Sequence, residues 1–227
     1  MLSSACLMPM AARTLVLALA TLVAAGGCAA GAPPPCGPSD PCAASERCVV
    51  GICRPAREAV APERSRRVVL LARDVAVLSP SESVDTAGAV TPFGARIADE
   101  VIVLMQFDGQ LGSKAEVASA FVVLDPEAAS PGPTQPIRLE AAEVLEAWEA
   151  GEPSWGRAPR LGPTIGSAIV PKARRAPVRI DVTKAIARTR GTGFGLALRA
   201  SGSDAYGARL ITAAGDSSGP RLELYLK

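Results

Sequence analysis

The chain has 227 residues, of which 48% are apolar but only 4% aromatic, and its formal net charge is +2. This near balance of 24 basic and 22 acidic residues gives no basic footprint for nucleic acid. The chain contains no His, which excludes Ser-His-Asp and Cys-His catalysis and every His-ligated metal site. The length fits one domain with accessory segments.

The chain begins with a targeting segment. Arg13 precedes the run Thr14–Ala25, which has no charged residue and is mostly apolar. A membrane-spanning helix needs about 20 apolar residues, so this shorter run is typical of a secretory signal. The residues that follow, Ala25-Gly26-Gly27-Cys28, resemble the lipobox of bacterial lipoproteins. The resemblance implies a signal peptide over residues 1–27 and acylation of Cys28.

Lipidation of Cys28 would anchor the protein to a membrane, because each buried CH₂ group contributes about 0.8 kcal/mol. Residues 28–35 would then form a lipidated tether. Ala29 is not the Asp that marks inner-membrane retention in such lipoproteins, so we expect the outer membrane or the cell surface of a bacterium. The alternative is an ordinary secretory cleavage that leaves Cys28 as a spare thiol.

Residues 36–53 form a Cys-rich stub with the spacing C-x5-C-x5-C-x4-C, at Cys36, Cys42, Cys48 and Cys53. So short a segment cannot bury enough apolar surface to fold unaided. An even number of Cys in an exported chain indicates disulfides. Three pairings are possible, and we favour the interlaced Cys36–Cys48 and Cys42–Cys53. A Cys₄ zinc site is the alternative, although its ligands usually come in more closely spaced pairs.

The stub, with its four Cys and the Gly51 turn, resembles the Dickkopf-N-terminal-like stubs of some bacterial lipoproteins. This resemblance implies a stiff spacer above the membrane, or else a small binding module. Residues 54–67 are rich in charge and contain two Pro, which predicts a solvated linker. Because stub and main domain share no obvious core, we expect reduction of the disulfides to leave the main melting transition nearly unchanged.

From Val68 to Lys227, short apolar runs recur between clusters of Gly, Pro, Ser and Asp, the pattern of one all-β domain. Two runs, Val101–Phe107 and Ala118–Leu124, are apolar on both faces and are expected to be central strands. The number and spacing of strands favour a jelly-roll type β-sandwich of about nine strands. The predicted strands are Val68–Leu78, Val101–Phe107, Ala118–Leu124, Ile137–Ala141, Ile165–Val170, Val178–Val182, Phe194–Ala200, Ala208–Ala213 and Leu222–Leu226.

Two short helices are predicted within this domain. Ala141, Val144, Leu145 and Trp148 have the i, i+3, i+4, i+7 spacing of one helical face. The second helix covers Lys184–Thr189, with Thr183 as its cap.

Six strings occur in the order VLMQFDGQL, VASAFVVL, VLEAWEAGEPSW, VRIDVTKAI, GFGLALRAS and PRLELYL. Together they resemble the DNRLRE domain family, also described as disaggregatase-related, over residues 68–227. The W-x6-W pair, IDVT and the terminal P-x-L-x-x-Y are the most specific parts. The family's Arg-Phe-Asp string reads Gln106-Phe107-Asp108 here. The resemblance implies a β-sandwich module of an exported bacterial protein, related to carbohydrate-binding modules.

Carbohydrate modules stack sugar rings on exposed aromatic side chains beside polar groups. Trp155 lies in the turn-rich loop GEPSWGRAP, where it is either a binding platform beside Arg157 and Arg160 or a plug that closes the sandwich end. Tyr206 is a second loop aromatic, beside Arg209. These five residues are the candidate ligand-binding residues. The remaining aromatic side chains of strand or helix patterns are expected in the core: Phe107, Phe121, Phe194 and Trp148.

Paired carboxylates would be needed for glycoside cleavage. Candidates stand at strand ends or in turns, where Asp commonly bonds to the backbone: Asp74, Asp99, Glu100, Asp108, Asp125, Asp181, Asp204 and Asp216. No pair has an apolar frame that would raise one pKa, so we expect no enzyme. We expect no cofactor and no metal, with a structural Ca²⁺ on such residues as the alternative.

These patterns predict a noncatalytic, lipid-anchored protein that binds or organises extracellular polysaccharide or an envelope partner. The Arg-rich candidates favour an acidic polysaccharide, because the guanidinium fork matches a carboxylate. A further basic run contains Lys172, Arg174 and Arg175. It is either a solvated loop or a second binding site for such a ligand. The alternatives are a structural protein–protein module, favoured by an exposed apolar patch, and a polysaccharide-cleaving enzyme.

Overall fold

The computed structural model describes residues 36, 41–49, 52–56, 65–81, 88–94, 100–109, 111, 115–130, 132–172, 177–189, 193, 195–201 and 206–227. The predicted signal peptide, Cys28, Asp99, Arg174, Arg175, Phe194 and Asp204 lie outside the described residues. None of the described helices is long and apolar enough to cross a bilayer.

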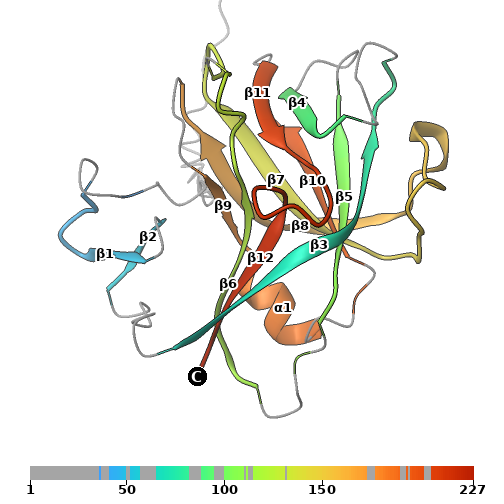
Figure 1. The fold of residues 1–227 in the computed structure, drawn as a ribbon. Coiled ribbons are helices and arrows are strands. Elements are labelled where there is room, and N and C mark those ends of the chain that lie inside the picture. Colours follow the sequence, from blue (N-terminus) through green and yellow to red (C-terminus); the bar gives the residue numbers. More distant parts are fainter. Residues whose placement is uncertain are drawn as a thin grey trace, which may run out of the picture. The chain divides into compact units, whose positions relative to one another are not determined.

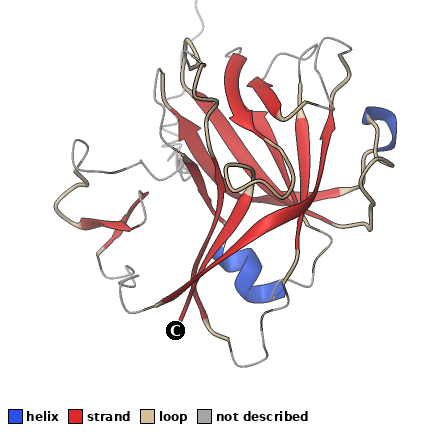
Figure 2. Cartoon of the chain, in the orientation of Figure 1, coloured by secondary structure: helices blue, strands red, loops and turns tan. Residues whose placement is uncertain are grey.

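The described part of the chain is built mainly of strands (Figure 2). In chain order the elements are β1 (Glu46–Val49), β2 (Ile52–Pro55), β3 (Arg66–Leu78), β4 (Val90–Gly94), β5 (Ile102–Phe107), β6 (Val117–Leu124), β7 (Ile137–Val144), η3 (Trp155–Arg157), β8 (Leu161–Val170), β9 (Val178–Asp181), α1 (Thr183–Thr189), β10 (Leu196–Ser201), β11 (Tyr206–Ile211) and β12 (Arg221–Leu226). The short element η3 is a 3₁₀ helix. The predicted all-β fold is confirmed.

One antiparallel sheet of eight strands, in the order β8-β7-β10-β5-β3-β12-β6-β9, forms both layers of the sandwich. Strand β3 belongs to both layers, as Figure 1 shows: residues 66–71 pair with β12, and residues 72–78 pair with β5. The register shifts between Ala72 and Asp74. Apolar residues from both halves of the sheet form one buried cluster. The sheet therefore folds over at β3 and encloses the core between its two halves.

The free ends of this folded sheet also approach each other, where β8 passes close to β9. A Cβ atom at Gly166 on β8 would collide with the backbone carbonyl oxygen of Asp181 on β9. Only a residue without a side chain allows this approach. The smaller β4–β11 sheet adds Phe93 and Leu210 to the same core.

The prediction of two central, doubly covered strands is confirmed. On β5, Val103 and Met105 face the main core, and Leu104 packs on the outer side with Trp148. On β6, Val122 and its alternate neighbours face the core, while the residues between them face outward and are also buried. Each strand has a neighbour on both edges, β10 and β3 for β5, and β12 and β9 for β6.

Two predictions of local structure need correction. The expected helix over residues 141–148 is wrong, because Ala141 and Val144 belong to β7 and Trp148 lies in the loop that follows. Strand β4 was not predicted. The second helix is confirmed as α1, which begins at Thr183 itself. The Thr183 hydroxyl accepts a hydrogen bond from the Ala120 amide of β6, at 2.9 Å.

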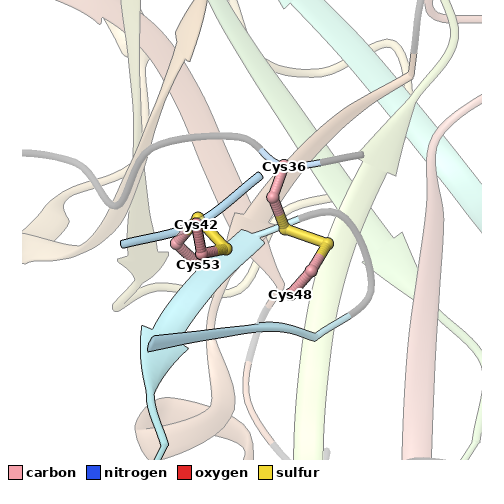
Figure 3. Close-up of a disulfide and its surroundings, with 4 residues drawn as sticks. All are labelled: Cys36, Cys42, Cys48 and Cys53. Carbon is pink, nitrogen blue, oxygen red and sulfur yellow. A yellow bond between two sulfur atoms is a disulfide. The ribbon is translucent and has the colours of Figure 1, made fainter. Parts of the chain in front are cut away.

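Strands β1 and β2 form a hairpin held by two disulfides, Cys36–Cys48 and Cys42–Cys53, as Figure 3 shows. Their Cα–Cα separations of 5.6 and 5.5 Å are usual for disulfides. The favoured interlaced pairing is confirmed. The hairpin extends to Pro55, and β3 begins at Arg66, so both ends of the expected linker lie in strands.

The stub packs against the outer face of the sandwich. Ile52 is buried in a cluster with Phe121, Val123 and Tyr225. Arg54 lies 5.5 Å from the centre of the Phe121 ring and forms an ion pair with a carboxylate of β9. The expectation that stub and sandwich share no core is therefore wrong. The sequence pattern did not show this contact because a single stub residue, Ile52, completes the apolar patch. The rest of the patch comes from β6 and β12, which are neighbours in the sheet but far apart in the sequence.

Next to this patch, Glu223 on β12 is fully buried and gathers three arginines. Its Oε1 accepts a hydrogen bond from Arg67 at 2.8 Å and lies 3.5 Å from nitrogens of Arg179 and Arg221. Burial, the largest single influence, raises the pKa of Glu223. The charge of Arg179 and the hydrogen bond and charge of Arg67 outweigh it, and hold that pKa below its usual range. The buried carboxylate is thus kept ionised by its partners.

Candidate functional site

The loop between β7 and β8, residues 145–160, carries three of the five candidate residues: Trp155, Arg157 and Arg160. Trp148 anchors this loop, because its side chain is buried with Leu104 and other outward residues of the sheet. Gln106 on β5 donates a hydrogen bond to the Trp148 carbonyl at 2.9 Å. The loop is therefore fixed on the sheet near its start.

The two ends of this loop are also tied together. The Leu145 amide donates to the Arg160 carbonyl at 2.9 Å, and the Arg160 amide donates to the Glu146 carboxylate at 3.0 Å. With its two ends and Trp148 held, the loop presents η3 in a defined position.

Trp155 opens η3 and does not enter the core. Its side chain is 36% exposed, and η3 contains no buried residue. The Arg157 amide closes the turn by donating to the Ser154 carbonyl at 2.9 Å. Trp155 was expected to be either a binding platform or a plug of the sandwich end. It does not plug the sandwich, and part of its aromatic ring is exposed.

The arginines of the loop differ in their surroundings. Arg160 faces Glu146, with 3.4 Å between Nε and Oε1. Within the described part of the chain, the Arg157 guanidinium has no carboxylate partner and is exposed. Arg157 therefore keeps its donors available to a ligand.

A hollow of about 530 Å³, which we call the loop hollow, lies beside Arg157. It is lined by Trp148, Glu146, Glu152, Arg157 and several small or proline residues. The two glutamates were not among the candidates. Only their position in a loop rich in Gly and Pro could have pointed to them.

The other two candidates stand elsewhere in the fold. Tyr206 and Arg209 belong to β11, and Arg209 forms an ion pair with Glu127. Arg209 does not line the loop hollow, and of the three loop candidates Arg157 lines it whereas Trp155 and Arg160 do not. The structure thus places three of the five candidates on one loop and two on β11. The side chain of Tyr206 lies outside the described part.

Several candidate carboxylates contribute to the architecture. Asp108 pairs with Arg73, and Asp125 binds Arg221 through two hydrogen bonds of 3.0 Å. Asp181 accepts the Thr183 amide at the start of α1, at 2.9 Å. Lys172 is an exposed turn residue after β8.

One group of side chains has the spacing of a metal site in the described part of the chain. The sulfur atoms of Cys36, Cys42 and Cys53 lie within 4.8 Å of one another. They are committed to the two disulfides, and metal binding requires free thiolates. The oxidised stub therefore does not fit a zinc ion.

In comparison with known proteins, no family model matches the chain and no curated protein matches it.

Proposed function

We propose that this chain is a noncatalytic cell-surface protein whose β-sandwich, of the DNRLRE kind, binds extracellular polysaccharide through the 145–160 loop. The observation that carries the proposal is one short turn that holds both the exposed Trp155 and Arg157. Arg157 lines the polar loop hollow and has no carboxylate partner among the described residues. An aromatic face offers a flat apolar surface to a sugar ring. The carboxylates of Glu146 and Glu152 are acceptors for sugar hydroxyl groups.

The same geometry supports an acidic polysaccharide. Among the described residues, Arg157 has no carboxylate partner, whereas Arg160 of the same loop has Glu146. The planar guanidinium of Arg157 matches a uronate carboxylate through two parallel hydrogen bonds. Arg160 and Arg209 already face glutamates, so they contribute less free positive charge. We therefore propose one acidic sugar at Arg157, with an adjacent ring stacked on Trp155.

We expect Arg157→Ala to weaken the binding of polygalacturonate and to flatten its dependence on salt, because it removes the ionic contact. Trp155→Ala should weaken binding without changing the salt dependence. Arg157 is exposed, so Arg157→Ala should change the free energy of unfolding by only about 0.5 kcal/mol or less. Melting curves show whether Trp155→Ala, which removes a 36% exposed ring, is folded. Titration calorimetry at several salt concentrations measures both effects.

Arg66→Ala, an exposed arginine of β3, is the matched control and should bind like the parent protein. If none of a panel of uronate-containing glycans binds, the proposal is wrong. Release of new reducing ends during the incubation would instead indicate a glycan-cleaving enzyme.

A structural protein–protein module is the second candidate, and it has its own observation. Val69 and Leu71 on β3 are 40% and 38% exposed on the outer face of the sheet, where they form neighbouring apolar positions. Exposed apolar patches often mark partner surfaces. Loss of an envelope partner in the Val69→Ser, Leu71→Ser variant, with glycan binding absent in the parent, would favour this candidate.

We also propose that Cys28 carries the membrane anchor, on the strength of the lipobox-like string. Cys28→Ser should then move the protein from the membrane fraction to the soluble exported fraction, because the acyl chains supply the buried CH₂ groups. Fractionation and immunoblotting measure this change. A Cys28→Ser protein that stays with the membranes after a salt wash would contradict the anchor.

A further inference from the structure

A second cavity, of about 540 Å³, which we call the end cavity, is lined in part by residues of α1. Figure 1 shows α1 at the end of the sandwich opposite β4 and β11. Its apolar wall is formed by Leu70, Phe107, Leu196 and Leu222 from four strands and by Ile186 from α1. All five pack in or against the main core. The cavity is thus an opening into the space between the two layers.

The polar side of the end cavity carries two ion pairs. Arg188 on α1 donates to Glu143, and Arg73 on β3 donates to Asp108 and to Gln106. Arg73 also pairs with Asp74, which is not part of the lining. Within the lining, the two arginines face two carboxylates, those of Glu143 and Asp108. A ligand with a net charge would leave that charge uncompensated.

Glu143 belongs to the inward-facing series of β7, opposite Leu196 in the register with β10. Its Oε2 is held by Arg188, but its buried Oε1 has no hydrogen-bond donor among the residues that the structure describes. A buried acceptor without a donor typically costs about 1–3 kcal/mol. Arg188 uses one of its five N–H donors on Glu143 and is 64% exposed. The cavity therefore has both an unfilled acceptor and unused donors.

We propose that the end cavity binds a small uncharged amphiphile, with an apolar body between the layers and a hydroxyl or primary amide head. Such a head both donates, to Glu143, and accepts, from Arg188. The volume lies within the range of about 300–1,000 Å³ that is usual for small-ligand sites. The site shares no residue with the proposed polysaccharide contact at Trp155 and Arg157, and stands independently of it.

The test uses the full chain and N-phenyl-1-naphthylamine, a neutral apolar fluorophore, as the reporter of cavity occupancy. Three competitors with one chain length are compared below their micelle concentrations: 1-decanol, decanoate and decylammonium. We expect 1-decanol to displace the reporter at a concentration roughly tenfold lower than either ion, a difference of about 1.4 kcal/mol. Equal displacement by all three, or a preference for either ion, would overturn the proposed head chemistry.

Gly193 stands in the lining and has open space around the position of a Cβ. Gly193→Phe should therefore obstruct the cavity without strain and reduce reporter uptake several-fold. Ala129→Phe, which adds the same ring to an exposed turn, is the control and should take up the reporter like the parent. Uptake that is unchanged in Gly193→Phe would place the reporter elsewhere and overturn the site.

Glu143→Gln tests the charge balance. It removes one negative charge and leaves Arg188 without its ionised partner, so decanoate should now compete better than 1-decanol. Melting curves show whether the variant is folded. A folded Glu143→Gln protein with an unchanged order of competitors would contradict the role given to this ion pair.

Discussion

Replacing Glu223 with alanine is expected to lower the free energy of unfolding by about 3–5 kcal/mol, the usual cost of breaking a buried ion pair from one side. The carboxylate is fully buried and is shared by Arg67, Arg179 and Arg221. Its loss leaves three guanidinium groups close together with their common partner gone. Urea unfolding, followed by near-ultraviolet circular dichroism, measures the change.

Glu127→Ala is the matched control, because Glu127 and Arg209 form a half-exposed pair at the surface. Such pairs contribute about 0–1 kcal/mol, so this variant should stay near the parent. If Glu223→Ala lowers the free energy of unfolding no more than Glu127→Ala does, the buried carboxylate does not stabilise the fold.

The pH dependence of the free energy of unfolding tests the same carboxylate with Glu223→Gln, which keeps the shape of the side chain. The arginines hold the pKa of folded Glu223 below its usual value, so its contribution is complete above the pKa of the unfolded chain. The contribution is lost as pH falls through the lower, folded pKa. The stability difference between the parent and Glu223→Gln should therefore be largest near neutral pH and shrink below about pH 4. A difference that grows in acid would contradict the assignment.

Reducing the two stub disulfides is expected to lower the melting temperature of the sandwich itself. Each bridge stabilises its segment by about 2–4 kcal/mol, chiefly by restricting the unfolded chain. Without them the stub no longer holds Ile52 on Phe121 and Tyr225, and that apolar face meets water. For a domain of this size, each lost kcal/mol lowers the melting temperature by about 2–4 °C. Melting curves with and without a phosphine reductant measure the shift.

Ile52→Ala provides the sharper version of this experiment. It keeps both disulfides but removes the side chain that reaches the sandwich, at a cost of about 2–5 kcal/mol. Because reduction and Ile52→Ala act through one contact, their effects should overlap rather than add. Leu71→Ala, at a 38% exposed position, is the control. If reduction leaves the melting temperature unchanged, the stub does not stabilise the sandwich and is an independent spacer.

Much of the sandwich could be predicted because alternation of apolar residues reports burial directly. The runs at β5 and β6 are apolar on both faces, and both proved to be central strands. The sequence could not tell what covers their outer faces. The covers are Trp148 for β5 and Ile52 for β6, single residues from segments that have no strand-like or helix-like pattern of their own.

The two errors of local structure have physical causes. The helical spacing from Ala141 to Trp148 arises by chance where a strand ends and a loop returns over the same sheet. Strand β4 contains Pro92 and Gly94, residues that usually mark turns, and it pairs only with β11 at the edge of the fold. In both segments, tertiary contacts and not the local sequence determine the secondary structure.

The candidate site could be predicted only where exposure follows from local composition. Trp155 stands between turn-forming residues, and this indicated a loop position. That Arg157 lacks a carboxylate while Arg160 and Arg209 have one depends on Glu146 and Glu127, whose positions only the folded chain defines. The end cavity was missed for the same reason, because its lining comes from strands that are distant in the sequence.

The position of β12 has a consequence for the order in which the chain can fold. The last strand is inserted between β3 and β6, so one layer of the sandwich stays open until the final residues are in place. A chain that is synthesised from its N-terminus would therefore expose the unpaired edges of β3 and β6 until β12 follows. Such long-range pairing is slow and leaves aggregation-prone edges. The native pairing of this layer forms only after β12 has been made.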